Sequence, residues 1–288
     1  MALHEIVGWP ASVDAPAMLV TLEGWIDAGF AAAGAMAHLR ASTDSTVVAR
    51  FDGDELLDHR SRRPVMHLVE GVNTGLTWPT IELRHGRDLD GRDVLLLTGP
   101  EPDLRWSAFV TEVVQLALRL GVRIVVPLGS YPVPLPHTRA GRIATSASTP
   151  ELAARAGTVH GTLDVPAGVH AVLERAFADA GVPVVGLWAQ VPHYAAAMAY
   201  PAASAEVVDA AAAIAGLRLD VTALREAGRL LRGRLDELVA ANDEHSAMVR
   251  ALEQSYDAEV VGSPPSPLLA SGEELAAEIE RFLREQGS

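Results

Sequence analysis

The chain has 288 residues, and its 37 acidic and 23 basic side chains give a formal net charge of −14. All basic residues are Arg, because the sequence contains no Lys. It also contains no Cys. The missing Lys excludes Schiff-base chemistry and the phosphate-binding Walker lysine. The missing Cys excludes thiol nucleophiles, disulfides and thiolate-bound zinc or iron–sulfur centres. The negative charge argues against nucleic acid and anionic membranes as main partners, since both are bound through a positive face.

Composition and hydropathy indicate a globular protein with a large core. Hydrophobic residues make up 49% of the chain and aromatic residues only 5%, which favours Ala, Val and Leu in tightly packed layers. The N-terminus lacks the basic and apolar regions of a signal peptide. The longest uncharged stretch, 180–205, contains three prolines and does not have the pattern of a membrane span. We therefore expect a cytoplasmic protein.

Strand candidates alternate with helix candidates between residues 15 and 215. The expected strands are apolar runs bounded by turn residues, at 18–23, 46–51, 65–69, 80–83, 94–98, 122–128, 142–148 and 182–188. The expected helices have one apolar face, at 28–39, 103–120, 169–180 and 206–215. This alternation predicts an α/β fold: a three-layer α/β/α sandwich with a mixed, mostly parallel central sheet. The strand-rich stretch 64–98 indicates an antiparallel excursion at one edge.

The pattern changes after the predicted core domain, which spans 1–216. We expect the remainder, 217–288, to be a helical C-terminal extension. It contains a proline-rich linker at 263–267 and a final predicted helix over 272–286, which a capping box at Ser271 begins.

The first part of this extension carries a heptad-like stripe. Apolar residues recur at alternating spacings of four and three, with three imperfect positions at Gly228, Asn242 and His245. A single long helix over 219–257 and a hairpin that turns near Asn242 both fit this pattern. The unbroken phase favours the single helix.

Three polar loops follow predicted strands, at 23–29, 129–139 and 190–194. Because ligands bind beyond the carboxyl ends of parallel strands, we expect these loops to share one edge and to form a cleft. His137 or His193 would act there as acid or base, and Arg139 would clamp an anion. The candidate cleft residues are Glu23, Trp25, Asp27, Gly129, Ser130, His137, Thr138, Arg139, His193 and Tyr194.

Several of these residues also have a structural interpretation. Glu23 or Asp27 would cap the following helix, and Arg139 would pair with one of these carboxylates. His193 would fix its loop. Since Ser130 lacks the G-x-S-x-G elbow, no complete set of nucleophile, base and orienting group is visible. The catalytic residues therefore stay unassigned, and whether the protein is an enzyme stays open.

The sequence predicts neither a metal site nor a cofactor. Segment 24–29 lacks the G-x-G-x-x-G fingerprint of dinucleotide sites. The ten His residues show neither H-x-H nor H-E-x-x-H spacing. An acidic cluster within 52–58 is followed at once by three Arg residues within 60–63, which favours local ion pairs on a solvated face.

The same loops carry a family resemblance. The matching segments, in chain order, are 24–29 (GWIDAG), 58–64 (DHRSRRP), 136–139 (PHTR), 166–168 (PAG), 191–194 (VPHY) and 252–257 (LEQSYD). In their order and spacing, the sequence resembles the bacterial branch of the proteasome assembly chaperone two family, in its actinobacterial form. The resemblance implies an α/β/α fold similar to the nucleoside phosphorylase and hydrolase group. It also implies a homo-oligomer, with a trimer as one candidate, and relatives that help to assemble proteasome α-subunit rings.

Two functions follow as expectations. The first is a homo-oligomeric, assembly-chaperone-like or binding protein whose partners are copies of itself and a proteasome-related or other protein. The alternative is a small-molecule hydrolase or phosphorylase-like enzyme that uses the cleft at the carboxyl ends of the parallel strands.

Overall fold

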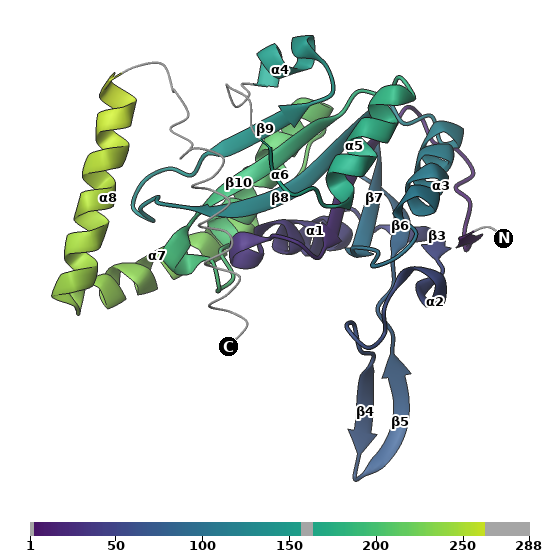
Figure 1. Ribbon diagram of the computed structural model, residues 1–288, viewed down its shortest axis with the longest axis horizontal. Coiled ribbons are helices and arrows are strands. Elements are labelled where there is room, and N and C mark those ends of the chain that lie inside the picture. The colour runs from purple at the N-terminus through teal and green to yellow at the C-terminus, as the bar shows by residue number, and fades with distance from the viewer. Residues whose placement is uncertain (1–2, 157–163, 263–288) are drawn as a thin grey trace.

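An eight-stranded sheet forms the middle layer of the computed structural model, which describes residues 3–156 and 164–262 (Figure 1). Its strands follow the order β1-β3-β6-β7-β2-β8-β10-β9. Their bounds are β1 (His4–Ile6), β2 (Ala17–Glu23), β3 (Thr46–Phe51), β6 (Glu82–Arg87), β7 (Asp93–Pro100), β8 (Ile124–Val133), β9 (Ile143–Ala147) and β10 (Val185–Pro192).

The sheet is mixed. Strands β7, β2, β8 and β10 pair in parallel, and β3 points the same way. Strands β1, β6 and β9 run in the opposite direction. The predicted mixed, mostly parallel sheet is confirmed. Within the stretch 64–98, where an antiparallel excursion was expected, β6 pairs antiparallel with both β3 and β7.

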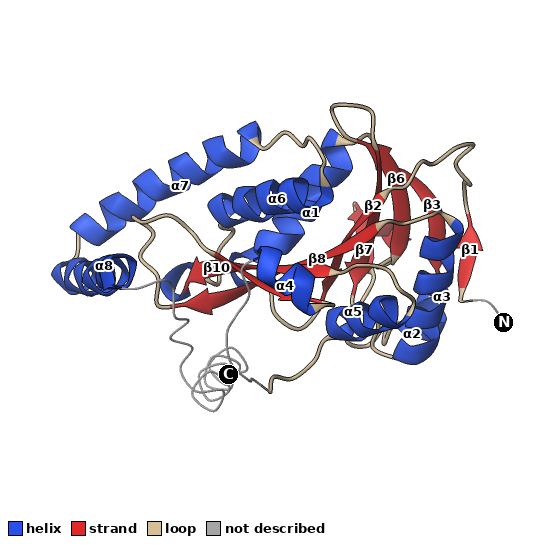
Figure 2. Ribbon diagram, turned by 90° about the horizontal axis from the view of Figure 1, so that it is seen from above, coloured by secondary structure: helices blue, strands red, loops and turns tan. Residues whose placement is uncertain are grey.

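Helices cover both faces of this sheet (Figure 2). Their bounds are α1 (Ala31–Ser42), α2 (Gly53–Leu56), α3 (Trp106–Arg119), α4 (Pro150–Ala156), α5 (Val169–Asp179) and α6 (Pro201–Ala215), with short 3-10 turns η1 (Ala28–Phe30) and η2 (His193–Ala195). Helices α1 and α6 pack on one face, and α3 and α5 pack on the other. The predicted α/β/α sandwich is therefore confirmed.

The central strand β2 is apolar on both sides because it contributes to two cores. Leu19 lies in the core under α1 and α6, whereas Met18 and Val20 lie in the core under α3 and α5. A strand buried on both faces has a continuous apolar run rather than an alternating one. This burial explains why the strand could be recognised from sequence.

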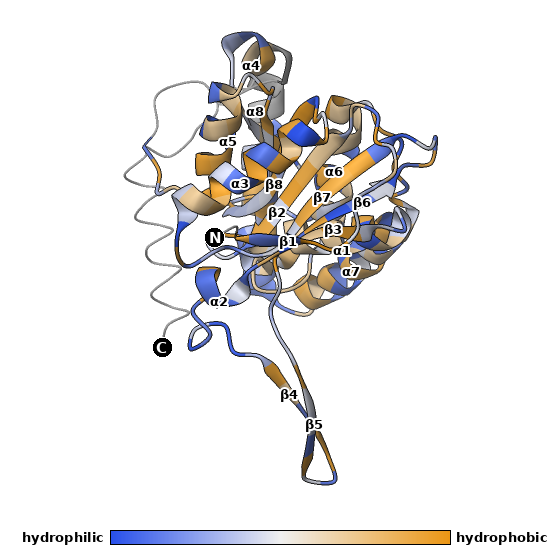
Figure 3. Ribbon diagram, turned by 90° about the vertical axis from the view of Figure 1, so that its right-hand side faces the viewer, coloured by the Kyte–Doolittle hydropathy of each residue, from blue (hydrophilic) through white to orange (hydrophobic). Residues whose placement is uncertain are grey.

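A separate two-stranded hairpin projects away from the sandwich (Figure 1; Figure 3). It consists of β4 (Val65–Val69) and β5 (Val72–Thr77). Glu70 and Gly71 join the strands with φ angles of 50° and 83°. Positive φ at both central residues is the geometry of the type I′ turn, whose twist matches that of a hairpin. Strand β4 was expected, but β5 was not, because its polar centre resembles a turn.

The C-terminal segment forms two helices, α7 (Thr222–Ala240) and α8 (Asp243–Gly262). The favoured single helix over 219–257 is therefore wrong. The break has a local cause: Asn242 Oδ1 accepts hydrogen bonds from the backbone N–H groups of Glu244 and His245, at 2.9 and 3.1 Å. An Asn in this position begins a new helix. The expected linker at 263–267 and the final helix at 272–286 lie outside the described residues.

Helix α7 packs on α6 through a close approach. A Cβ atom on Gly228 would lie 3.1 Å from Ala202 Cα, so the missing side chain allows the two helices to touch. Gly228 weakens the heptad pattern in sequence, yet it is a contact residue in the fold. Within the described ranges, no helix is both long and apolar enough to cross a bilayer.

Candidate functional site

Asp27 holds the start of α1. Its Oδ1 and Oδ2 atoms accept hydrogen bonds from the backbone N–H groups of Ala32 and Ala33, at 2.8 and 2.9 Å. These donors belong to the first turn, where N–H groups have no partner within the helix. Asp27 therefore has the capping role that was one of its two interpretations.

Ser130 fastens the end of β8 to the same loop. Its side chain is fully buried, and its Oγ lies 2.6 Å from Asp27 Oδ1 and 2.8 Å from the carbonyl oxygen of Ala28. Since a hydroxyl has one proton, these two acceptors share it. The neighbouring Gly129 makes room for Trp188, whose ring would lie 2.5 Å from a Cβ atom at that position. Ser130 thus fixes the first loop to β8, and Gly129 allows the Trp188 ring of β10 to pack closely on β8.

His137 is the centre of a complete hydrogen-bond network. Tyr194 Oη lies 2.7 Å from both His137 Nδ1 and the His137 backbone nitrogen, and His137 Nε2 lies 3.1 Å from Asp236 Oδ1. One assignment satisfies every group: the Tyr194 hydroxyl donates to Nδ1, accepts from the backbone N–H, and Nε2–H donates to Asp236. Burial is the main reason that the pKa of Tyr194 is raised. This network connects the loop after β8 with η2 and α7.

Arg139 binds helix α8 rather than the first loop. Its guanidinium forms a bidentate pair with Asp257 and also donates to Glu253 Oε1 at 3.0 Å. The hydrogen bonds to Asp257 raise the pKa of Arg139, and the Arg139 side chain lowers the pKa of Asp257. Thr138 Oγ1 also donates to Glu253. The expected pairing of Arg139 with Glu23 or Asp27 is therefore wrong.

The remaining candidates lie at the margins. Glu23 is exposed at the end of β2, and the pKa of its carboxyl is raised by partial withdrawal from water and by Asp27. His193 is also exposed, with its ring 5.3 Å from that of Tyr194. The second loop contacts the first loop through Ser130 and Asp27, and it contacts the third loop through His137 and Tyr194. The polar side chains of the second loop are also bound by α7 and α8.

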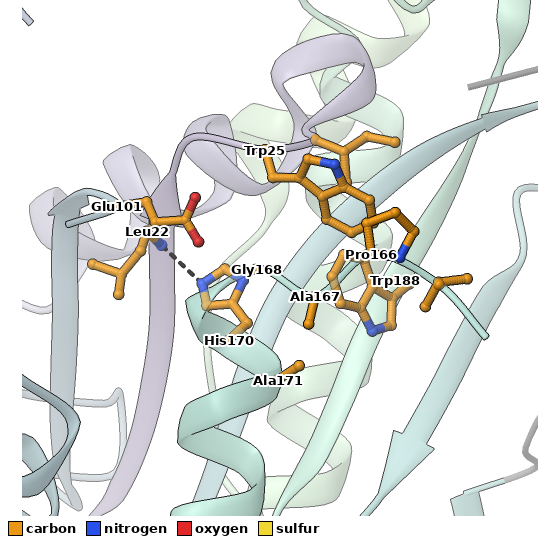
Figure 4. Close-up of a pocket in the computed structure, with 11 residues that line it drawn as sticks. Leu22, Trp25, Glu101, Pro166, Ala167, Gly168, His170, Ala171 and Trp188 are labelled. Carbon is orange, nitrogen blue, oxygen red and sulfur yellow. Dashed lines mark hydrogen bonds between the residues drawn. The ribbon is translucent and has the colours of Figure 1, made fainter. Parts of the chain in front are cut away.

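A cavity of about 150 Å³ lies at a different point of the same edge (Figure 4). Strands β2 and β7 are parallel neighbours, but α1 and α3, which follow them, cover opposite faces of the sheet. Ligands of α/β proteins bind at such topological switch points. The residues that define this switch-point cavity are Leu22, Trp25, Glu101, Gly168, His170 and Trp188.

Of these six residues, only Trp25 was a sequence candidate. Glu101 follows a predicted strand almost directly, and His170 follows segment 166–168, which carries part of the family resemblance. Both signals were available, but neither residue belongs to a recognisable motif. Within residues 3–156 and 164–262, no group of three or more His, Asp or Glu side chains is arranged to hold a metal ion.

Comparison with known proteins identifies the family. The PAC2 family model matches residues 21–239. A Mycobacterium tuberculosis protein of unknown function, Rv2714, is 36% identical with a TM-score of 0.87, and the match covers 100% of this chain and 97% of that one. A Corynebacterium glutamicum protein of unknown function is 33% identical, with a TM-score of 0.86 and coverage of 92% and 100%.

A third similar structure has a descriptive name. The Mycobacterium tuberculosis proteasome-assembly chaperone homologue Rv2125 is 31% identical with a TM-score of 0.75, over 81% of this chain and 99% of that one. No curated protein matches the chain. The resemblance deduced from the sequence is confirmed, and the chain belongs to the PAC2 family.

Proposed function

We propose that this protein is a homo-oligomeric, assembly-chaperone-like protein, and that the β4–β5 hairpin is the contact between its copies. The observation that carries the oligomer is the exposure of this hairpin. Its apolar side chains are 46% exposed at Leu76 and up to 63% exposed at Val72. An isolated two-stranded hairpin is marginally stable in water, and clustered apolar side chains on a surface mark interaction sites.

The chaperone-like role has a different support. Rv2125, which is 31% identical, is described as a proteasome-assembly chaperone homologue. The polar side chains of the second loop also argue against a catalytic role, because they are already paired with side chains of the C-terminal helices. Arg139 pairs with Asp257 on α8, and His137 pairs with Asp236 on α7. Ser130 makes its hydrogen bonds with Asp27 and Ala28 rather than with an imidazole base.

The oligomer is tested by the mass of the full chain in solution, measured by sedimentation or light scattering. In the double variant Leu68→Glu with Val72→Glu, two charges enter the hairpin without touching either core. We expect the wild type to be an oligomer and this variant to dissociate. The matched control Leu118→Glu places a charge on α3 at a side chain that is 51% exposed. A wild-type monomer, or dissociation of the control alone, would contradict the proposal.

The chaperone-like role is tested with proteasome α-subunits from the same organism. Their assembly into rings is followed by native mass spectrometry, with and without the full-length protein. We expect the protein to form a complex with unassembled subunits and to speed ring formation. If neither complex nor acceleration is observed while the oligomer is intact, the chaperone-like role is wrong and the oligomer proposal stands.

A further inference from the structure

The switch-point cavity contains an imidazole whose proton position is fixed by the fold. The backbone N–H of Leu22 donates to His170 Nε2 at 2.9 Å. A nitrogen that accepts a hydrogen bond has no proton, so the neutral ring holds its proton on Nδ1. Burial lowers the pKa of His170 to about 4, which keeps the ring neutral near pH 7. His170 Nδ1–H is therefore a hydrogen-bond donor.

This donor belongs to the cavity rather than to the protein's own network. His170 lines the cavity, and within the described residues its ring makes a single hydrogen bond, the one from Leu22 to Nε2 (Figure 4). His170 is half-buried, and its Nδ1–H stays open to the cavity. A ligand acceptor can pair with Nδ1–H there.

Glu101 supplies an acceptor in the same cavity. Its Oε1 accepts from the backbone N–H of Val169 at 2.5 Å and so caps α5. Its Oε2 accepts from no donor in the described part of the chain. The carboxylate is backed by Gly24, where a Cβ atom would lie 2.7 Å from Oε2. The start of α5 is thus already capped, and Oε2 is available to a donor on a ligand.

The walls and the charge restrict what can enter. Trp25 and Trp188 provide aromatic surfaces, and about 150 Å³ corresponds to one small ring, since an engineered cavity of that size holds benzene. At Oε2 the Glu101 carboxylate favours a ligand with a hydrogen-bond donor. A cation would face the Nδ1–H donor of His170, and a purely apolar ring would leave that donor unpaired.

We propose that the switch-point cavity binds a small, neutral, planar ring that carries a carbonyl acceptor beside an N–H donor, the chemistry of a lactam. The carbonyl oxygen accepts from His170 Nδ1–H, the ring N–H donates to Glu101 Oε2, and the ring lies among Trp25, Trp188 and Leu22. This site is separate from the hairpin, so it is independent of the proposed oligomer.

The test uses 2-pyridone as the probe, 1-methyl-2-pyridone as its match without the donor, and toluene as an apolar ring. Titrations of the full-length protein follow the indole N–H signals of Trp25 and Trp188 by NMR. We expect saturable binding of 2-pyridone in the millimolar range, as for a fragment of this size. Loss of one hydrogen bond weakens binding by about three- to tenfold, so 1-methyl-2-pyridone binds more weakly by that factor.

Variants assign each bond. In Glu101→Gln the cap of α5 is kept but the acceptor is lost, so the preference for 2-pyridone over its methyl derivative disappears. In His170→Gln the side-chain oxygen still accepts from Leu22, but the Nδ1–H donor is lost, so both pyridones bind about three- to tenfold more weakly. His170→Asn keeps a donor near the position of Nδ1 but loses the acceptor for the Leu22 backbone N–H. This variant therefore binds 2-pyridone, while its folded state is less stable than that of the wild type.

Three results would overturn the proposal. The first is that 2-pyridone does not shift the signals of Trp25 and Trp188. The second is that toluene binds as tightly as 2-pyridone. The third is that the preference between the two pyridones is unchanged in Glu101→Gln. Because each variant is also checked for its oligomeric mass, failure here is distinguishable from failure of the hairpin contact.

Discussion

Arg139 and Asp257 lie 118 residues apart and form a bidentate ion pair, with Arg139 Nε 2.8 Å from Oδ1 and Nη2 2.6 Å from Oδ2. A planar guanidinium matches a carboxylate in this way with two parallel hydrogen bonds. The pair connects the loop after β8 to helix α8. The one side chain expected to clamp an anion thus holds a part of its own chain.

Breaking this pair should loosen α8. We expect Asp257→Asn to increase hydrogen exchange of the α8 backbone amides severalfold, because the charge-assisted contact is lost while the fold of the core is kept. Since Arg139 lowers the pKa of Asp257, the pair is intact above the ordinary carboxyl range and is lost as the pH falls through the lowered pKa. The control Arg250→Gln removes a charge from α8 outside this pair, and equal exchange in both variants would contradict the prediction.

Removing the Tyr194 hydroxyl should destabilise the whole domain. Tyr194→Phe leaves both the backbone N–H and Nδ1 of buried His137 without their partner. Buried groups that lose a partner cost about 1–3 kcal/mol, which urea denaturation measures directly. The control Tyr256→Phe removes an exposed hydroxyl that donates to the Ala140 carbonyl, so it should cost much less. The prediction is wrong if the two variants are equally stable.

The cap of α1 should contribute more to stability than the serine beneath it. Asp27→Ala removes the acceptor of two backbone N–H groups and of the Ser130 hydroxyl, and loss of a helix cap costs about 0.5–2 kcal/mol. Ser130→Ala leaves the cap intact and should cost about 1 kcal/mol. Thermal denaturation of both variants gives the order. A larger loss for Ser130→Ala would show that the hydroxyl, not the cap, fixes this loop.

Local chemistry made part of this architecture predictable. Strand β2 has an apolar residue at almost every position because both of its faces are buried, and Asp27 stands where a capping residue is needed. Burial and capping act within a few residues of the chain, so they leave a pattern that can be read. The sandwich and the first loop follow from such patterns.

The partners of the second loop depend on distant contacts. His137 meets Asp236, and Arg139 meets Asp257, across 99 and 118 residues. No spacing rule connects such positions, so the carboxylate partners of His137 and Arg139 could not be predicted from the sequence. A turn near Asn242 was one of the two alternatives, but the single helix was favoured because a capping side chain can start a new helix without disturbing the heptad phase. The cavity residues Glu101 and His170 likewise meet only in the folded chain.

The neutral His170 ring should make stability depend on pH. Its pKa is about 4 in the folded protein, whereas an unfolded His titrates near 6.5. Between these values the unfolded state binds more protons, so this contribution is complete above pH 6.5 and declines as the pH falls toward 4. From pH 7.5 to pH 5 the loss is about 2 kcal/mol. In His170→Gln the bond from Leu22 is kept but nothing titrates, so the difference in unfolding free energy between wild type and variant should shrink by that amount. Urea denaturation at both pH values measures it, and a difference that stays constant would show that folding does not lower the pKa of His170.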